Sequence, residues 1–202
     1  DATGASTHDH PATSHDWTGG TTWEPGTGTW EPGTTADDSG GGDDPSPGCM
    51  QYCAAMMSTC TGANGQYSSI DSCLGVCATL PPGAPGETAG NSLACRAYHA
   101  GMAVNDPETH CVHAGPGGAG VCGSNCEGFC AIAVATCPNE HPDTPTCLAT
   151  CGGFADVEKY DIGDAAGNTF ACRLYHLTVA ATDEGSALQH CGHTIAASPT
   201  CK

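Results

Sequence analysis

Aromatic residues are scarce in this chain, and so are cations. Phe, Trp and Tyr make up 5% of the 202 residues, whereas Gly alone contributes 29. A conventional hydrophobic core would therefore be thin. So few cations cannot replace the counterions of a phosphate backbone, which excludes nucleic acid as a natural partner and disfavours anionic membrane surfaces. The net charge is −18, and the basic residues are Arg96, Lys159, Arg173 and Lys202.

Long apolar runs are missing as well. No stretch of the sequence is long and apolar enough to predict a transmembrane segment. The chain begins at Asp1 rather than Met, and we expect that a secretory signal peptide has been removed. The strong acidity favours solubility and attracts cations.

Cysteine is abundant, with 16 residues. Small domains that bury little apolar surface rely on disulfides, which persist in oxidising compartments. We therefore predict eight disulfides and an extracellular or cell-surface location. The alternative is a cytosolic store in which reduced thiols bind metal, but the cysteine spacing favours disulfides.

Residues 1–48 differ in composition from the rest of the chain. They contain no Cys, Lys or Arg, nine acidic residues, ten Thr, and a repeated heptapeptide, TTWEPGT followed by GTWEPGT. Glu-Pro-Gly-Thr is typical of a type II turn. We predict an extended, turn-rich, acidic tail, on whose Thr residues O-glycans are plausible. All three Trp of the chain lie in this tail, at Trp17, Trp23 and Trp30.

Residues 49–202 contain an internal repeat, which predicts one eight-cysteine module at 49–124 and a second at 125–202. GNSLACRAYHAGMA at 90–103 aligns with GNTFACRLYHLTVA at 167–180, and HCVH at 110–113 aligns with HCGH at 190–193. Two such copies indicate a duplication. The aligned cysteines are Cys49, Cys53, Cys60, Cys73, Cys77, Cys95, Cys111 and Cys122 in the first copy, and Cys126, Cys130, Cys137, Cys147, Cys151, Cys172, Cys191 and Cys201 in the second.

The secondary structure pattern is helical in both modules, and the fold class we predict is mainly α. Ser46 and Pro47 are a typical N-cap and first-turn pair for a helix through Cys60. Further helices are expected from Ser69 to about Thr79, from Asn91 to about Val104, and as a short turn after Asp106. The second copy repeats this order, with starts near Asn125, Thr144, Asn168 and Asp183. We expect almost no sheet outside the tail.

Each module carries two CX3C pairs on consecutive predicted helices. This pattern resembles the twin-CX3C hairpin of small intermembrane-space chaperones and plant hairpin peptides, over about a third of each module. The resemblance implies that the outer cysteines pair with each other and the inner ones likewise. The implied bridges are Cys49–Cys77, Cys53–Cys73, Cys126–Cys151 and Cys130–Cys147.

The remaining four cysteines of each module have no such precedent, and eight cysteines allow 105 pairings. The simplest assignment is Cys60–Cys95 and Cys111–Cys122 in the first module. Its counterpart in the second module is Cys137–Cys172 and Cys191–Cys201.

A second resemblance rests on the motif CRxYH followed by HCxHAGP and CG. The first copy has Cys95-Arg96-Ala97-Tyr98-His99 and HCVHAGP from His110, whereas the second keeps CRLYH and HCGH without AGP. The pattern resembles uncharacterised cysteine-rich secreted or lipoprotein-like proteins of deltaproteobacteria. The resemblance implies an exported bacterial protein and brings no known activity.

Three histidines recur in each copy of the repeat. The one in CRxYH lies a helical turn after a cysteine, and the other two flank a cysteine at i and i+3, so disulfides should gather all three. Three histidines with an open coordination position suit Zn²⁺ or Cu²⁺. The predicted metal ligands are His99, His110 and His113 in the first module, and His176, His190 and His193 in the second.

Other interpretations of these histidines stay open. Histidines near Arg96 can form a hydrogen-bonded core without metal, because a neutral imidazole can donate to a carbonyl. Non-covalent haem is a further alternative, whereas covalent haem c is not indicated, since CXXCH is missing. No nucleophile elbow, phosphate loop or HEXXH helix appears, so we expect no enzyme activity.

The function predicted first is that of a structural, self-assembling extracellular subunit. Trp buries a large, rigid surface and is a strong interface anchor. Docking of the tail on a neighbouring copy, repeated head to tail, would give a filament or surface layer rigidified by eight disulfides. The alternatives are a flexible stalk and a metal-binding or electron-transfer module that uses the two histidine sets.

Overall fold

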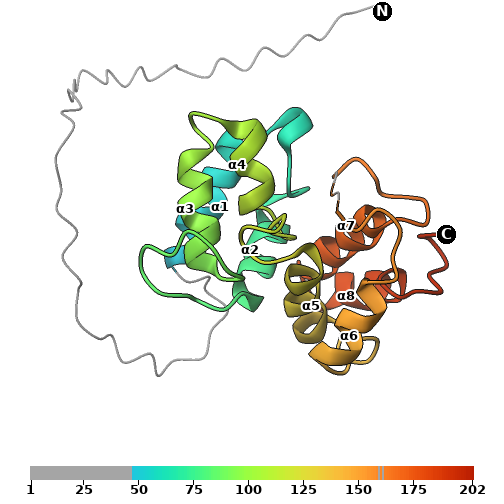
Figure 1. Ribbon diagram of the computed structural model, residues 1–202. Coiled ribbons are helices and arrows are strands. Elements are labelled where there is room, and N and C mark those ends of the chain that lie inside the picture. The colour runs from blue at the N-terminus through green and yellow to red at the C-terminus, as the bar shows by residue number, and fades with distance from the viewer. Residues whose placement is uncertain (1–46, 159, 161) are drawn as a thin grey trace, which may run out of the picture. The chain divides into compact units, whose positions relative to one another are not determined.

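The computed structural model describes residues 47–158, 160 and 162–202. The predictions for the tail, for Ser46 and for Trp17, Trp23 and Trp30 lie outside these residues. The described part of the chain is mainly α-helical and contains no strand, as predicted (Figure 1). Its helices are α1 (Pro47–Thr59), α2 (Ile70–Thr79), α3 (Leu93–Met102), α4 (Pro107–Ala114), α5 (Asn125–Thr136), α6 (Thr144–Cys151), α7 (Phe170–Ala180) and α8 (Glu184–His190), with 3₁₀ turns η1 (Gly62–Asn64) and η2 (Cys191–His193).

Short polar side chains start these helices by accepting a hydrogen bond from a first-turn backbone N–H. Ser69, Asp106 and Asp183 cap α2, α4 and α8 as predicted. The predicted starts at Asn91, Asn125 and Asn168 are displaced by one residue, and Asp143 rather than Thr144 caps α6. The caps observed at those four helices are Ser92, Ser124, Asp143 and Thr169.

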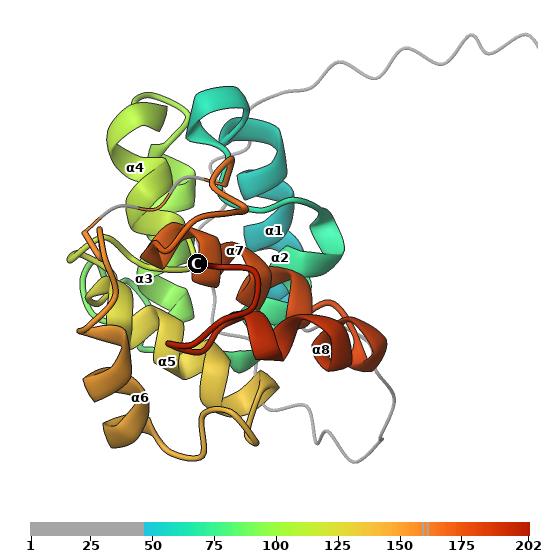
Figure 2. The ribbon, with the colours of Figure 1, turned by 90° about the vertical axis from the view of Figure 1, so that its right-hand side faces the viewer.

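Each module consists of two helical pairs (Figures 1 and 2). Helix α1 packs on α2 and α3 on α4 in the first module, while α5 packs on α6 and α7 on α8 in the second. The CX3C pairs bridge the first pair of each module through Cys49–Cys77, Cys53–Cys73, Cys126–Cys151 and Cys130–Cys147. These are the bridges that the twin-CX3C resemblance implied.

The other four predicted bridges are wrong. Helix α4 packs on α1, so Cys111 meets Cys60 at the end of α1, with 5.5 Å between their Cα atoms. Cys95 in the first turn of α3 is then bridged to Cys122. The second module repeats this exchange of partners. The predicted Cys60–Cys95, Cys111–Cys122, Cys137–Cys172 and Cys191–Cys201 are replaced by Cys60–Cys111, Cys95–Cys122, Cys137–Cys191 and Cys172–Cys201.

The described residues belong to one compact unit, and the two modules pack on each other within it. Helix α2 of the first module contacts α5 and α7 of the second. At this junction Gly75 approaches Ala181 so closely that a Cβ atom on Gly75 would lie 1.8 Å from the Ala181 carbonyl oxygen. The side-chain amide of Asn91 also donates to the carbonyl of Glu127, at 3.1 Å. A glycine at position 75 is therefore required for the modules to dock as they do.

Each module contains one buried arginine that holds backbone carbonyls. Arg96 is completely buried and donates to the carbonyls of Ser92, Gly115 and Pro116. Arg173 donates to backbone carbonyls that include those of Ile195 and Cys201, and its guanidinium lies 4.4 Å from the ring centre of Phe154. Burial lowers the pKa of both arginines, yet carbonyl oxygens satisfy their donors.

The arginine contacts explain why the second copy tolerates the loss of AGP. Arg96 binds the carbonyls of the Gly and Pro in that motif, and Arg173 binds the carbonyls of the equivalent residues, Ile195 and Ala196. A backbone carbonyl is present whatever the side chain. The motif can therefore diverge while the contact is kept.

Candidate metal centre

The three histidines of the first module come from two packed helices. His99 lies in α3, one turn after Cys95, and is 6% exposed. His110 and His113 lie in α4 on either side of Cys111, whose bridge to Cys60 ties α4 to α1. The packing of α3 on α4 brings the three rings together, with centroids 5.0–6.0 Å apart. The predicted convergence of His99, His110 and His113 is thus present in the structure.

One imidazole nitrogen of each ring lies within 4.8 Å of those of the other two. Nδ1 of His99 lies 2.9 Å from Nδ1 of His110. Nδ1 of His113 is buried and has no hydrogen-bond partner. The two histidines of α4 remain partly exposed, so the cluster is reached from solvent on that side.

A backbone carbonyl selects the tautomer of His99. Its Nε2 lies 3.1 Å from the carbonyl oxygen of Thr88. A carbonyl only accepts, so Nε2 of His99 carries the proton and Nδ1 of the neutral ring presents a lone pair. Hydrogen bonding of this kind orients metal-ligating histidines in proteins.

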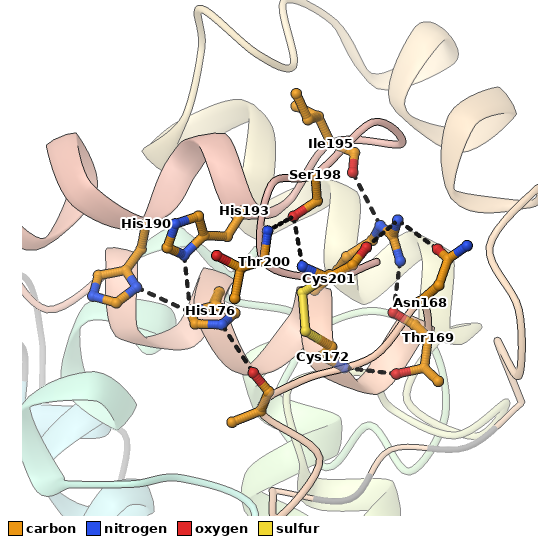
Figure 3. Close-up of a disulfide and its surroundings, with 12 residues drawn as sticks. Asn168, Thr169, Cys172, His176, His190, His193, Ile195, Ser198, Thr200 and Cys201 are labelled. Atoms are coloured by element: carbon orange, nitrogen blue, oxygen red, sulfur yellow. Dashed lines mark hydrogen bonds between the residues drawn. A yellow bond between two sulfur atoms is a disulfide. The ribbon is translucent and has the colours of Figure 1, made fainter.

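The second module repeats the arrangement, as Figure 3 shows beside the Cys172–Cys201 disulfide. Nδ1 of His176 lies 3.0 Å from Nδ1 of His190 and 3.3 Å from Nδ1 of His193. Nε2 of His176 lies 3.1 Å from the carbonyl oxygen of Ala165, the counterpart of the Thr88 contact. The duplication has therefore preserved both the three rings and the carbonyl that orients the buried one.

These clusters match the donor set of a transition-metal ion. A tetrahedral zinc ion sits about 2.0–2.1 Å from each nitrogen, which separates its ligand atoms by roughly 3.3 Å. The Nδ1–Nδ1 distances are close to that value, at 2.9 Å for His99–His110, 3.0 Å for His176–His190 and 3.3 Å for His176–His193. Three neutral nitrogens suit Zn²⁺ or Cu²⁺ and are poor ligands for Ca²⁺ or Mg²⁺, which prefer oxygen.

Cysteine does not contribute thiolates to these clusters. Cys95 and Cys122 lie close to His99, and Cys172 and Cys201 lie close to His176. All of these cysteines are in disulfides, and no described cysteine is free. The donor set consequently consists of imidazole nitrogens.

The surroundings keep several of these imidazoles neutral. Burial, then the neighbouring His99 and His110, lowers the pKa of His113. Burial, then His193 and His190, lowers the pKa of His176, which the carbonyl of Ala165 partly opposes. Neutral rings have the lone pairs that a metal ion requires.

Sequence reasoning missed the parts of the site that come from the backbone. The carbonyls of Thr88 and Ala165 carry no sequence signal, because any residue supplies one. The partners of Arg96 are of the same kind. In the structure Arg96 binds the carbonyls that directly follow α4, and it thereby holds the helix that carries His110 and His113.

His141 lies between α5 and α6, outside both helices, and is 3% exposed. Its Nε2 lies 2.8 Å from the hydroxyl oxygen of Thr194. It belongs to neither three-histidine cluster, so a variant at His141 is a control for replacing a buried histidine outside the clusters.

The first module is similar in sequence to known proteins. Residues 48–125 match the BfoA family C-terminal domain. The match includes all eight cysteines of the first module and its three clustered histidines. The match supports the prediction that this chain resembles a family of cysteine-rich proteins.

Curated relatives include two Aspergillus proteins. Aurasperone B biosynthesis cluster protein A of Aspergillus niger is 41% identical over 71 residues, which cover 35% of this chain and 23% of the relative. Bifonsecin B biosynthesis cluster protein A of Aspergillus brasiliensis is also 41% identical over 71 residues, covering 35% of this chain and 24% of the relative. The chain thus spans about a quarter of the length of these relatives.

A putative EGF-like domain-containing protein of Acanthamoeba polyphaga mimivirus is 33% identical over 112 residues, which cover 54% of this chain and 20% of that protein. No solved structure matches the chain. These fungal and viral relatives do not support the deltaproteobacterial origin that the CRxYH motif indicated.

None of the described helices is long and apolar enough to cross a membrane. The density of disulfides is consistent with an extracellular protein, because such bridges persist in oxidising surroundings.

Proposed function

We propose that this chain is a non-enzymatic extracellular protein that binds one transition-metal ion, Zn²⁺ or Cu²⁺, in each of its two modules. One observation carries the proposal: each of three histidines in the first module offers a nitrogen within 4.8 Å of the other two, and the same arrangement recurs in the second. The proposed ligands are His99, His110 and His113, with His176, His190 and His193.

The competing interpretation is a hydrogen-bonded histidine core without metal. In such a core every buried nitrogen should find a donor or acceptor, because an unpaired buried polar atom is costly. Nδ1 of His113 has none. A cation bound between the three rings would give this nitrogen a partner, and this supports the metal-binding interpretation.

The direct test is a zinc titration of the full chain after chelator treatment. Isothermal calorimetry under non-reducing conditions measures the number of ions bound. We expect two Zn²⁺ per chain in the wild type and none in the double variant H99A/H176A. Two controls keep both clusters: H141A removes the buried histidine outside them, and H8A/H10A/H15A removes the tail histidines. Both should still bind two ions.

Two results would contradict metal binding at these sites. The first is an absence of zinc binding by the folded wild type. The second is retention of two ions by H99A/H176A. If the wild type does bind zinc as expected, elemental analysis of natively purified protein would identify the ion that the protein carries in its own environment.

Self-assembly through the tail is a separate proposal, which rests on the sequence. Trp17, Trp23 and Trp30 are the chain's whole complement of Trp and would anchor the tail on a neighbouring copy. Electron microscopy and size-exclusion chromatography of the chain with and without residues 1–48 test it. Filaments of the full chain that persist after this truncation would contradict a role for the tail, and mass spectrometry would reveal any O-glycans on it.

A further inference from the structure

The two histidine clusters differ at their third histidine. In the second module, Nδ1 of His193 lies 3.3 Å from Nδ1 of His176, within hydrogen-bond distance. In the first module, Nδ1 of the equivalent His113 is buried and has no hydrogen-bond partner. The rings are also further apart there: the His99–His113 centroid distance is 5.0 Å, against 4.5 Å for His176–His193.

A local difference in helix geometry accompanies this asymmetry. Helix α4 continues through Val112 and His113 and ends at Ala114. Helix α8 ends at His190, and the 3₁₀ turn η2 then carries Gly192 and His193. A 3₁₀ turn is wound more tightly than an α-helix and aims its side chains in different directions. The glycine at 192, where the first module has Val112, accompanies this tighter turn.

The hydrogen bonds that an ion must replace therefore differ between the clusters. His176 presents one lone pair at Nδ1, because its Nε2 donates to Ala165. His190 at 3.0 Å and His193 at 3.3 Å therefore share this lone pair, each as an Nδ1–H donor. An incoming ion has to displace both contacts. In the first module only the contact between His99 and His110 is displaced. There the ion also supplies the missing partner of His113.

We propose that the first-module cluster is the tighter of the two metal sites and fills first. This inference rests on the proposed function, since it ranks the two sites. Leaving a buried polar atom unpaired costs about 1–3 kcal/mol, which corresponds to roughly a 5- to 150-fold difference in binding constant.

The test is a titration of the chelator-treated full chain with ZnCl₂, with the sites identified by histidine footprinting. We expect two binding steps whose affinities differ by at least about fivefold. Diethyl pyrocarbonate labelling at one equivalent of Zn²⁺ should find His110 and His113 protected and His190 and His193 still reactive. This measurement needs no variant, so it does not depend on how well a variant folds.

Single variants then assign the two steps. H113A should lose the tighter step and H193A the weaker one. G192V places the first module's valine in the second, where a Cβ atom meets nothing within 4 Å. We expect G192V to raise the affinity of the weaker step toward that of the stronger.

Two equal binding steps, or protection of His190 and His193 before His110 and His113, would overturn the ranking and leave metal binding intact. A complete lack of zinc binding would instead overturn the proposed function. The two failures are therefore distinguishable in one experiment.

Discussion

Nε2 of His99 lies 3.1 Å from the carbonyl oxygen of Thr88, and this contact decides which nitrogen of the ring faces the cluster. His176 and Ala165 repeat it at the same distance in the second module. A carbonyl can accept only from a protonated nitrogen, so in both modules Nδ1 is left with its lone pair directed into the histidine cluster, toward His110 in the first module and toward His190 and His193 in the second. The loops before α3 and α7 therefore belong functionally to the histidine clusters.

The Cys60–Cys111 bridge should control the first cluster alone. C60A/C111A opens a cross-link between residues 51 positions apart, which costs about 4 kcal/mol of unfolding free energy in the chain-entropy account. Because Cys111 lies between His110 and His113, we also expect about a tenfold weaker zinc affinity in the first module. Calorimetry with H193A as background isolates that site.

The matched control for this bridge is C137A/C191A, which removes the equivalent bridge of the second module. It should weaken zinc binding in the second module and leave the first unchanged. Equal loss of zinc affinity at both sites in either variant would argue against local positioning of the histidines by each bridge.

Peptide mapping of the wild type without reduction should recover Cys60 linked to Cys111.

Replacing the buried Arg96 should destabilise the protein. R96M leaves the carbonyls of Gly115 and Pro116 without their donor and lowers the free energy of unfolding by about 2–4 kcal/mol. R96K keeps the charge but loses the planar fork, so it should fall between wild type and R96M. Chemical unfolding under non-reducing conditions measures this.

The control for charge is K202M, which removes the same charge at an exposed position. We expect its stability to lie within about 0.5 kcal/mol of wild type. If K202M were as destabilising as R96M, net charge rather than the carbonyl contacts would account for the loss.

Gly75 should be required for docking of the two modules. In G75A the added Cβ would overlap the Ala181 carbonyl, so α2 and α7 must separate, at a cost of about 1–3 kcal/mol. G101A is the matched helical control, since a Cβ there meets nothing within 4 Å. Alanine is the better helix former, so G101A should be up to about 1 kcal/mol more stable than wild type.

These two variants are compared by thermal unfolding. A G75A protein as stable as wild type would contradict the tight approach of α2 to the end of α7. Proteolysis between the modules should be faster in G75A than in G101A, because a weakened junction opens more often.

Acidification should destabilise the protein partly through His141. Burial lowers its pKa below the ordinary value of 6.5, an effect that Glu140 opposes. The unfolded chain then binds more protons than the folded one, so this stabilisation is present above pH 6.5 and is lost as the pH falls below it. H141N, which cannot titrate in this range, should show a weaker loss of stability between pH 7 and pH 5.

Chemical unfolding of the wild type and of H141N at several pH values, without metal, gives the slope of unfolding free energy against pH for each protein. The lowered pKa values of His113, His176 and His190 act in the same direction and remain in H141N. Some loss of stability with acidification should therefore persist in the variant. Identical slopes for the two proteins would show that His141 does not contribute.

Local features of the sequence determined much of the architecture. The mainly α class and the order of the helices followed from capping residues and cysteine spacing, because these act within one or two turns of the chain. The bridges of the CX3C pairs followed from a resemblance in spacing. The gathering of His99, His110 and His113 was predicted from their positions beside cysteines, but no disulfide joins α3 to α4, and it is the packing of these two helices that brings the rings together.

Only the tertiary structure decided what depends on contacts between distant segments. Cys60 pairs with Cys111 rather than Cys95 because α4 packs on α1, and no local pattern encodes that packing. The Thr88 carbonyl and the partner of Arg96 were equally invisible, because backbone carbonyls are the same in every residue. The proposed ranking of the two clusters rests on the 3₁₀ turn at His193 and on ring centroids that differ by 0.5 Å between the modules, because a duplicated motif does not encode such differences in backbone geometry.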